Sequence, residues 1–447
     1  MTTVAETIAA WCASPPPSSP KSRKLACEAI ADTLACLYAG RDDDATRAAA
    51  RAFGRDGGAP SLLVTGGRQR PSVAAMINGT AAHALDFDDN FTPGMSHPSA
   101  VIVPALLALL PHEVISGRAL IDAYLVALQA QAFVGSGVAA SHYTAGWHGT
   151  STIGSIGTAA GTARLLGLDE VGIAAAMTLG ASMASGTKGQ FGAPAKPFHA
   201  GMAARNAVDA ALLAAEGLRG RGDILEGPQG FLEMFGGESP TGYDVHAISM
   251  TRDHVIETEG LLPKLHPCCG STHLAIDALF DLMAEEAFDA EEVVSADCHI
   301  GIANYRNLAF SAPTNGMEAR FSMNYCLALA LRYGRLSLAD FTPDGVARFS
   351  GDPLLGRVRM THYTDEEERK GGRLPHRLRL ALADGRILER ARPLPRGGIT
   401  EPFTEEERRG KFRDCLDGVV SSDALYESLL ALDEQENLTF LRPFFPG

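Results

Sequence analysis

The stretch SRKLACEAIADTLACLYAG, from Ser22 to Gly40, shows the pattern that decides the fold of the first half of the chain. Its apolar residues recur every three to five positions, as they do along one face of an α-helix, and Gly40 stands where a helix C-terminal cap is expected. The same pattern, rich in alanine, leucine and glycine, continues from Lys21 to about Gly260, and so many small residues imply closely spaced helices. Further helices are predicted at residues 71–85, 97–110, 117–139, 150–166, 168–183 and 199–215.

After about Pro263 the pattern changes to alternating apolar and polar residues. EEVVSADCHIGI, from Glu291 to Ile302, predicts a strand, and the two alternating runs of His376–Arg392 predict a hairpin because Asp384-Gly385 joins them. Residues 354–364 are a third candidate strand, residues 318–334 predict an amphipathic helix that ends on a glycine, and residues 404–416 predict a further helix.

The two patterns predict a mainly α protein with two domains, since 447 residues exceed what one hydrophobic core usually supports. We expect a large all-helical domain followed by a smaller α+β domain, in which helices cover an antiparallel sheet. The helix at residues 404–416 is expected to pack back on the first domain.

The composition is that of an ordinary soluble protein, with 46% hydrophobic and 21% charged residues. A net charge of −14 argues against nucleic acid or an anionic membrane as a partner, because both attract basic surfaces. We find no signal segment and expect no apolar run to span a bilayer, so we expect a cytoplasmic protein. The eight cysteines are scattered without a C-x-x-C pair, which argues against zinc and iron–sulfur sites and predicts reduced thiols.

The segment HALDFDDNFTPGMSHPSA, residues 83–100, gathers acids and histidines between two helical patterns. If Asp86, Asp88 and Asp89 face one cavity, their repulsion raises at least one pKa unless cations or hydrogen-bond donors compensate, and His97 is a natural compensator and proton carrier. A solvated loop with helix-capping aspartates and a metal site built from Asp88, Asp89 and His97 are the alternatives. We favour no metal, and we expect Asp88 and Asp89 to organise the loop through backbone hydrogen bonds.

Two glycine-rich segments place basic side chains beside predicted helix starts. In GWHGTSTIGSIGTAAGTARLLGL, residues 146–168, His148 precedes a helix N-terminus that could attract an anion through its N–H groups and dipole. In GTKGQFGAPAKPFHAGMAARNA, residues 186–207, Lys196 and His199 lie in the turn before the next predicted helix and suit a carboxylate. The plainer alternatives are an ordinary helix cap beside a loop histidine, and surface lysines.

A third group, LLPKLHPCCGSTH at residues 261–273, lies at the presumed domain boundary. It supplies Lys264, two histidines and the vicinal pair Cys268-Cys269. Clefts between domains are common ligand sites, which favours a functional role. A vicinal pair seldom forms a structural disulfide, so we interpret these cysteines as packing residues.

The three groups share one chemical character, because each places histidine or lysine near a turn or a helix start. Such groups suit a small substrate with two or three carboxylates, held by cations while a proton moves at the carbon next to one carboxylate. The sequence motifs of dinucleotide sites, P-loops, α/β-hydrolases and zincins are missing. Chemistry of this kind requires no organic cofactor, and we expect none.

The chain resembles the MmgE/PrpD family in HALDFDDNF, SHPSAVIVPALLAL, GWHGTSTIGSIGTAAGTARLLGL, AKPFHAGMAARNAV and PKLHPCCGSTH, which occur in the same order. That family includes 2-methylcitrate dehydratase, cis-aconitate decarboxylase and iminodisuccinate epimerase. The resemblance implies a helical domain of residues 1–262 and 396–447, an α+β lid of residues 263–395, and a homodimer. It also implies an active site between the helical domain and the lid, with no metal and no organic cofactor.

Carried over to this sequence, the site residues of the family that we predict to be catalytic are Asp86, His97, His148, Lys196 and Lys264. We predict that the substrate is also contacted by Asn90, His199, Cys269, Tyr305 and Arg320. Asn90 stands where the decarboxylase members have threonine, and Cys269 replaces a histidine of their lid motif, which weakens an assignment as cis-aconitate decarboxylase. The KP-x-H-x-G-x-AARN run is closer to the epimerase.

We predict a cofactor-independent lyase, of the dehydratase or decarboxylase type, that acts on a small di- or tricarboxylate by proton transfer at the carbon alpha to a carboxylate. His148 or His97 transfers the proton, Asp86 orients, and Lys196 and Lys264 bind carboxylates in this hypothesis. Two alternatives stay open: a racemase or epimerase of an aminodicarboxylate such as iminodisuccinate, and a non-catalytic helical dimer that binds a carboxylate.

Overall fold

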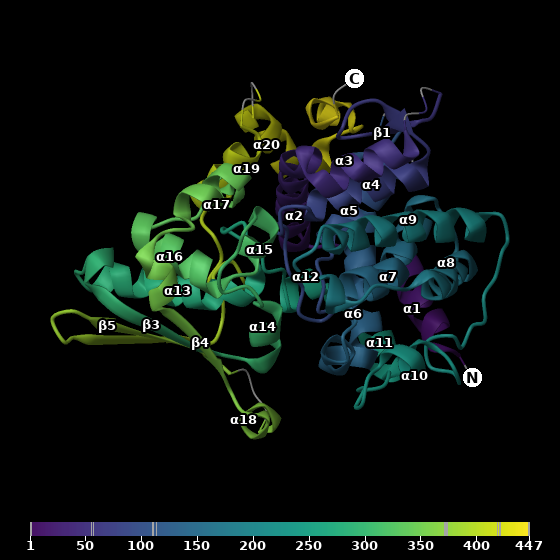
Figure 1. Ribbon diagram of the computed structural model, residues 1–447. Coiled ribbons are helices and arrows are strands. Elements are labelled where there is room, and N and C mark those ends of the chain that lie inside the picture. The colour runs from purple at the N-terminus through teal and green to yellow at the C-terminus, as the bar shows by residue number, and fades with distance from the viewer. Residues whose placement is uncertain are drawn as a thin grey trace. The chain divides into compact units, whose positions relative to one another are not determined.

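The computed structural model describes residues 2–445, except Arg55, Gly57, Leu110, Glu113, residues 371–373, Gly418, Val420 and Ser421. The chain divides into two compact units (Figure 1). The first unit contains Met1–Gln190, Pro194–Pro263 and Thr404–Gly447, and the second contains Phe191–Ala193 and Lys264–Phe403. The chain passes between the units at Gln190–Phe191, Ala193–Pro194, Pro263–Lys264 and Phe403–Thr404, and the sequence predicts boundaries at 262–263 and 395–396.

The first unit is built mainly of helices, as the sequence predicts. Ser19 caps the first long helix by accepting a hydrogen bond from the N–H of Ser22, Pro20 occupies its first turn, and the helix ends at Gly40. The α-helices of this unit are α1 (Val4–Ala13), α2 (Pro20–Ala39), α3 (Asp44–Phe53), α4 (Pro71–His83), α5 (Ser99–Leu109), α6 (Gly117–Thr144), α7 (Gly149–Leu165), α8 (Glu170–Met183), α9 (Ala195–Ala215), α10 (Phe231–Phe235), α11 (Val245–Met250), α12 (Val255–Thr258), α19 (Glu405–Cys415) and α20 (Ser422–Leu430). Short 3-10 helices lie at Gly40–Asp42, Lys188–Gln190, Leu432–Glu434 and Thr439–Phe444.

Two details of the first unit differ from the prediction. The unit is not all-helical, because β1 (Ser61–Leu62) and β2 (Arg68–Gln69) form an antiparallel ribbon. In addition, α9 begins earlier than predicted, so Lys196 and His199 lie in its first two turns and not in the turn before it. Pro197 does not prevent this start, because the N–H groups of a first helical turn have no partner within the helix.

Close contact between α4 and α9 positions the polar residues described below. A Cβ atom on Gly79 of α4 would lie 3.0 Å from the Cα of Gly201 in α9, and a Cβ on Gly201 would lie 2.3 Å from the carbonyl oxygen of Met76. Larger residues at either glycine would therefore separate the helices. Since α4 ends at His83 and α9 begins at Ala195, this contact brings the end of one helix beside the start of the other.

The C-terminal segment completes the first unit. Thr404 and Glu407 form a capping box at the start of α19, which packs against α2. The ammonium of Lys411 lies 2.6 Å from a carboxylate oxygen of Asp32 in α2 and donates a 2.7 Å hydrogen bond to the carbonyl oxygen of Phe87. The prediction of a helix that returns to the first domain is confirmed.

One helix of the first unit is long and apolar enough to cross a membrane, which the sequence analysis did not expect. This is the Gly117–Val138 part of α6, and 83% of its most apolar window is buried inside the structure. A buried helix of this kind is what the core of a helical unit provides, and the finding by itself is weak evidence for a membrane.

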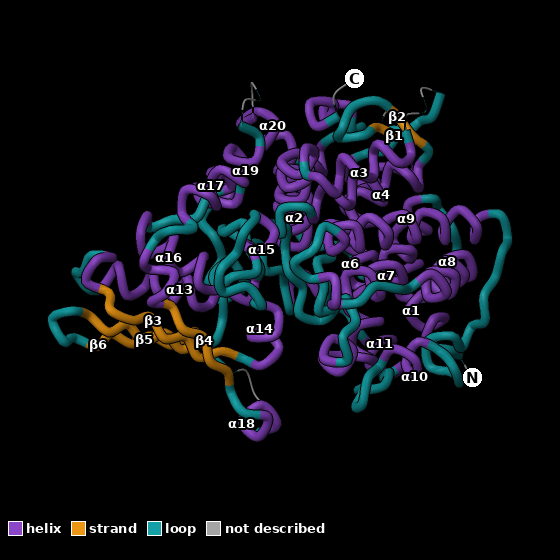
Figure 2. The backbone as a smooth tube through the Cα atoms, in the orientation of Figure 1, coloured by secondary structure: helices purple, strands orange, loops and turns teal. Residues whose placement is uncertain are grey.

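The second unit contains a mixed sheet of four strands in the order β4-β3-β5-β6 (Figure 2). The strands are β3 (Val293–Ile300), β4 (Val358–His362), β5 (His376–Leu382) and β6 (Ile387–Arg392). The predicted hairpin of β5 and β6 is confirmed, and its turn places Gly385 at a φ of 90°. The prediction of an antiparallel sheet is wrong for one pair, because β4 runs parallel to β3 after a long helical crossover.

Helices α13 and α16 lie along one face of this sheet (Figures 1 and 2). The helix predicted at residues 318–334 is broken, because Ser322 caps a new helix that ends at Gly334 in the left-handed conformation. The helices of this unit are α13 (Gly270–Glu285), α14 (Ile302–Asn307), α15 (Gly316–Arg320), α16 (Met323–Tyr333), α17 (Pro343–Phe349) and α18 (Asp365–Arg369), with 3-10 helices at Ala290–Glu292, Leu338–Phe341 and Pro353–Arg357.

Candidate active site

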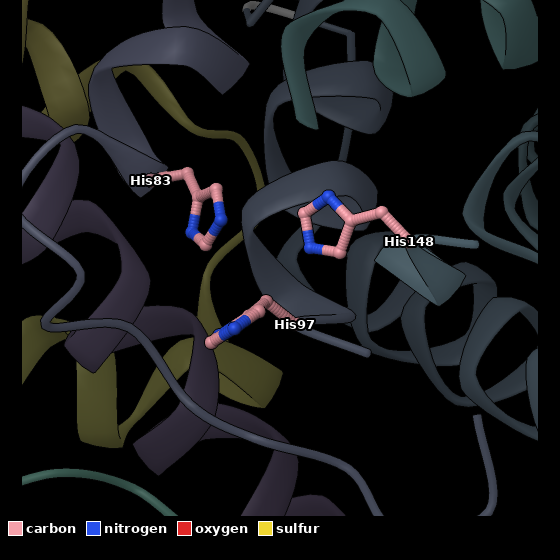
Figure 3. A group of neighbouring side chains, drawn as sticks. All are labelled: His83, His97 and His148. Carbon is pink, nitrogen blue, oxygen red and sulfur yellow. The ribbon is translucent and has the colours of Figure 1, made fainter. Parts of the chain in front are cut away.

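Buried polar side chains converge in the first unit, where the end of α4, the loop of residues 84–98, and the starts of α7 and α9 meet. Figure 3 shows the rings of His83, His97 and His148, which reach toward one another from three of these segments. One nitrogen of each ring lies within 4.8 Å of the others. We define the histidine cluster as His83, Asp86, Asp88, His97, His148 and Lys196.

The loop that carries the aspartates is buried and held by its backbone. Asp86 has a φ of 52°, a left-handed conformation that aspartate adopts more readily than most residues. Asn90 and Leu262 exchange two backbone hydrogen bonds of 2.9 Å. Asp86, Asp88 and Asp89 are only 3%, 0% and 2% exposed, so the interpretation as a solvated loop is wrong.

The histidine cluster contains two carboxylates and one ammonium, with imidazole rings between them. The ammonium of Lys196 donates a hydrogen bond of 2.5 Å to Asp86 and lies 3.0 Å from Nε2 of His83. Nδ1 of His83 lies 2.9 and 3.0 Å from the two carboxylate oxygens of Asp88, and Nδ1 of His97 lies 3.5 Å from the same carboxylate. The expectation that Asp88 bonds to the backbone is therefore corrected, since its carboxylate contacts two imidazole rings.

The neighbouring Asp89 has a different environment. Its carboxyl group accepts a 2.5 Å hydrogen bond from the hydroxyl of Ser99, which also lies 2.7 Å from the hydroxyl of Tyr124. The backbone N–H of Ser99, the first residue of α5, lies 3.4 Å from the other oxygen, so Asp89 does organise the loop as expected. Burial raises the pKa of Asp89 to about 8, and this carboxyl group is mostly protonated at neutral pH.

His148 directly precedes a helix start, as the sequence predicts, and it is the N-cap residue of α7, which begins one residue earlier than expected. Its backbone N–H donates to the carbonyl oxygen of Gly186, and its Nδ1 lies 3.0 Å from Nδ1 of His199 in α9. The following residue must be glycine, because a Cβ on Gly149 would lie 2.3 Å from the carbonyl oxygen of Gly94. This close approach brings the loop of residues 84–98 to the start of α7.

The imidazole rings of His83, His148 and His199 are held neutral. Burial lowers the pKa of His83 and lowers the pKa of His148 well below its usual range, and the Lys196 ammonium lowers both further. Burial also lowers the pKa of His199 to about 4. A neutral imidazole can accept a proton near pH 7, so the site combines proton acceptors with one buried ammonium.

Two groups of described side chains are close enough to hold a metal ion, namely His83, His97 and His148, and His83, Asp86, Asp88 and His97. The ammonium of Lys196 argues against this use, because it lies within hydrogen-bond distance of both His83 and Asp86 and would repel a second cation. The Nδ1 atom of His83 is also engaged by Asp88. This donor set suits an anionic ligand and proton transfer better than a resident metal.

Four predicted site residues belong to the second unit. Lys264 is completely buried. Cys269 precedes α13 and donates its backbone N–H to the carbonyl oxygen of Arg320 at 2.9 Å, so these two are neighbours. Tyr305 is 37% exposed, and its ring centroid lies 4.7 Å from that of His362. The predicted residues that the structure brings together in the first unit are Asp86, His97, His148, Lys196 and His199.

The sequence analysis missed two central members of the histidine cluster. His83 was predicted only as the first residue of the segment 83–100, within the helix expected at residues 71–85, and Asp88 was predicted to organise the loop. The available signal was the spacing of Gly79 and His83, which places both on the same face of α4. That signal becomes useful only when α9 is known to pack on this face.

Comparison with known proteins places the chain in a family. Residues 6–244 match the model of the MmgE/PrpD N-terminal domain, and residues 266–433 match that of the MmgE/PrpD C-terminal domain. The chain belongs to the MmgE/PrpD family. The resemblance seen in the sequence is thereby confirmed.

Several curated proteins that are similar to this MmgE/PrpD member are named cis-aconitate decarboxylase. The mouse protein is 28% identical over 391 residues, covering 84% of this chain and 79% of its own, and the human protein is 27% identical over 394 residues, covering 85% and 80%. A cis-aconitate decarboxylase-like protein of Aspergillus oryzae is 25% identical over 444 residues, covering 94% and 92%. A decarboxylase is a lyase, and the chain is an enzyme of this MmgE/PrpD type.

Proposed function

We propose that this MmgE/PrpD member is a cofactor-independent lyase, of the decarboxylase or dehydratase type, that acts on a small di- or tricarboxylate. The observation that carries the proposal is the buried ammonium of Lys196, held by Asp86 beside three imidazole rings. An ammonium in a site of low polarity binds a carboxylate and stabilises the negative charge that develops on it during the reaction. The names of the relatives support the substrate class.

Either type of lyase reaction needs one proton transfer and one charge-stabilising cation. In a dehydration, a neutral imidazole removes the proton alpha to a carboxylate, and the resulting imidazolium returns that proton to the departing hydroxide, which leaves as water. In a decarboxylation, carbon dioxide leaves, its bonding electron pair stays on the carbon, and this carbon takes up a proton that the neutral imidazole has first accepted from solvent. We propose His148 as the group that transfers the proton, with His97 as the second candidate.

Asp86 orients Lys196 in this proposal, and His199 orients His148 through the 3.0 Å contact of their Nδ1 atoms. The family resemblance supports Lys264 as a second carboxylate-binding cation, with substrate contacts from Asn90, Cys269, Tyr305 and Arg320. A homodimer and a cytoplasmic location are proposed on the resemblance and on the composition, respectively.

The proposal is tested by following candidate acids with the purified protein in deuterium oxide by proton NMR. The panel contains cis-aconitate, citrate, 2-methylcitrate, a malate-type acid and an iminodisuccinate-type acid. We expect one acid to be consumed, with a product that has lost carbon dioxide or water. Deuterium exchange at the alpha carbon without net consumption contradicts a lyase and supports the epimerase alternative, which the KP-x-H-x-G-x-AARN run favours.

A further inference from the structure

His83, whose ring lies between Asp88 and Lys196, has no role in the proposed function. We propose that Asp88 and His83 position Lys196: Asp88 fixes the tautomer of His83, and His83 in turn fixes the direction of the Lys196 ammonium. The inference rests on the proposed function for what Lys196 does, but the arrangement itself can be measured without substrate.

The four groups form one continuous chain of contacts. Asp88 contacts Nδ1 of His83 at 2.9 and 3.0 Å, Nε2 of His83 lies 3.0 Å from the ammonium of Lys196, and the ammonium reaches Asp86 at 2.5 Å. The side chains of His83 and Asp88 are 0% exposed, and those of Lys196 and Asp86 are 3% and 4% exposed. Water therefore does not compete for these hydrogen bonds.

Asp88 and Lys196, which contact the two ring nitrogens of His83, decide its tautomer. A carboxylate can only accept hydrogen bonds, so Nδ1 of His83 must carry a hydrogen to bond Asp88. An ammonium can only donate, so Nε2 of His83 must present its lone pair to Lys196. Only the neutral Nδ1–H tautomer meets both requirements. The other neutral tautomer, or the imidazolium, would direct an N–H bond at the ammonium.

The surroundings of His83 keep its ring neutral. The loop contributes Asp86, Asp88 and His97, α7 contributes His148, and α9 contributes Lys196. Burial is the main cause that lowers the pKa of His83, and Lys196 acts in the same direction, while Asp88 and Asp86 oppose them. The net shift is downward, so Nε2 keeps its lone pair at neutral pH.

Two fixed acceptors determine how the ammonium of Lys196 is turned. Its three N–H bonds are tetrahedral about the nitrogen, so bonding one to Asp86 and one to His83 fixes the direction of the third. A preoriented donor loses little conformational entropy when a carboxylate binds, and it meets the developing charge without rearrangement. Without His83, the ammonium would lose one of the acceptors that fix its direction.

The tautomer is tested by NMR on protein labelled with ¹⁵N at histidine, without ligand, in a two-bond ¹H–¹⁵N spectrum at pH 7. The His83 signals are assigned by their loss in H83Q. We expect the neutral Nδ1–H tautomer in the wild type and a larger share of the Nε2–H tautomer in Asp88→Asn, because an asparagine side chain can also donate to a bare Nδ1, which leaves only Lys196 to favour the Nδ1–H form. An imidazolium or an Nε2–H tautomer in the wild type overturns the inference, whether or not the protein is a lyase.

The positioning role is tested by kinetics with two substitutions of His83, using the acid that the NMR panel shows to be turned over. Glutamine can donate to Asp88 and accept from Lys196 through its amide, whereas leucine fills space and can do neither. We expect kcat/KM of H83L to be at least about tenfold below that of H83Q, since a small misplacement of a positioned group costs this much or more. Asp88→Asn is expected to lower kcat/KM less than H83L does.

Circular dichroism and the melting temperature show whether each variant is folded. If H83L does not fold, the comparison of Asp88→Asn with the wild type replaces it, because asparagine keeps the size of the side chain. Equal kcat/KM values for wild type, H83Q and the leucine or asparagine variant would overturn the positioning role. A His83 that only supports the fold would give folded H83L and H83Q the same kcat/KM.

Discussion

The histidine cluster of the first unit and a cysteine cluster of the second unit, defined as Cys268, Thr272, His273 and Cys326, are both buried but are stabilised in different ways. In the histidine cluster, the neutral ring of His83 lies between the carboxylate of Asp88 and the ammonium of Lys196, which pairs with Asp86. In the cysteine cluster, the Sγ of Cys268 lies 3.2 Å from the hydroxyl of Thr272 and 3.7 Å from Nε2 of His273. Burial raises the pKa of Cys268, but hydrogen bonding by Cys326 and the nearby His273 outweighs burial and brings this pKa to about 5.

The surroundings of the two clusters differ as much as their contents. Cys268 and Cys326 belong to the hydrophobic core of their unit, packed among side chains such as Leu279 and Phe321. The histidine cluster lies beside buried hydroxyl groups, and the hydroxyl of Thr150 accepts the backbone N–H of His97 at 2.9 Å. A charged group with polar neighbours can replace one of its hydrogen bonds by a bond to a substrate. A polar group surrounded by apolar side chains has no other partner available and keeps the hydrogen bonds that it has. The comparison therefore separates a candidate active site from a structural cluster.

The largest expected effect is the loss of turnover in His148→Gln. Glutamine keeps a hydrogen-bonding group near His199 but cannot transfer a proton near neutral pH, so kcat should fall by about 10²- to 10⁴-fold. His254→Gln is the matched control, because His254 is buried in the same unit but contacts the carbonyl oxygen of Pro16. Steady-state assays that show equal activity for both variants would remove His148 from the chemistry.

The next effect concerns the buried ion pair of the histidine cluster. Lys196→Met leaves the carboxylate of Asp86 buried without its ammonium, and the free energy of unfolding should fall by about 3–5 kcal/mol. The double variant Asp86→Asn/Lys196→Met removes both charges and should regain part of this loss, although it remains inactive. Urea denaturation of wild type, both single variants and the double variant measures the coupling, and additive losses would contradict a direct pair.

A smaller effect is expected in the cysteine cluster. Cys268→Ala removes one buried sulfur atom from an apolar core, so the free energy of unfolding should fall by about 1–2 kcal/mol. We expect kcat to stay within about threefold of the wild type, because an effect below 1 kcal/mol on the barrier is of that size. A variant that folds as well as the wild type but has lost turnover would break the comparison and make this cluster part of the chemistry.

The last expected effect is a change in the pH dependence of stability in Asp89→Asn, seen as a slope and not as a loss at one pH. The pKa of Asp89 is raised to about 8 in the folded protein, so its protonated form stabilises the fold at low pH and this contribution is lost as the pH rises from about 4 to about 8. Asparagine resembles the protonated acid and has no such dependence. The free energy of unfolding of the wild type, relative to that of Asp89→Asn, should therefore decline between pH 5 and pH 8. This range lies between the pKa of Asp89 in the unfolded chain, about 4, and its pKa in the folded protein, about 8. Parallel curves from urea denaturation would show that Asp89 is ionised in the folded protein.

Much of the fold is predictable from local sequence patterns. The helical period at residues 22–40, the glycine that ends this helix, and the Asp384-Gly385 turn all act over a few residues, and the structure confirms each of them. The parallel pairing of β3 with β4 was not predictable in this way. Strand direction depends on how the intervening helices cross the sheet, and no short segment encodes that path.

The candidate site was predictable as a set of residues more than as a set of contacts. Asp86, His97, His148 and Lys196 were selected from local motifs, and the structure places them together in one unit. The histidine that contacts both Lys196 and Asp88 was not predicted as a site residue, because the sequence shows it only as one residue of a predicted helix. Its role depends on a contact across 113 positions of the chain.

By itself, the sequence determined the family, the helical first unit, the hairpin of the second, and the kinds of side chain available for chemistry, because all of these follow from local periodicity and motif spacing. Only the tertiary structure decided which neighbour each ionisable group has. Asp88 and Asp89 are adjacent in the sequence, yet one contacts two imidazole rings and the other contacts Ser99 and is mostly protonated at neutral pH. The electrostatic state of a buried group is set by burial and by charges within a few ångströms, and in this protein those charges come from helices that are distant along the chain.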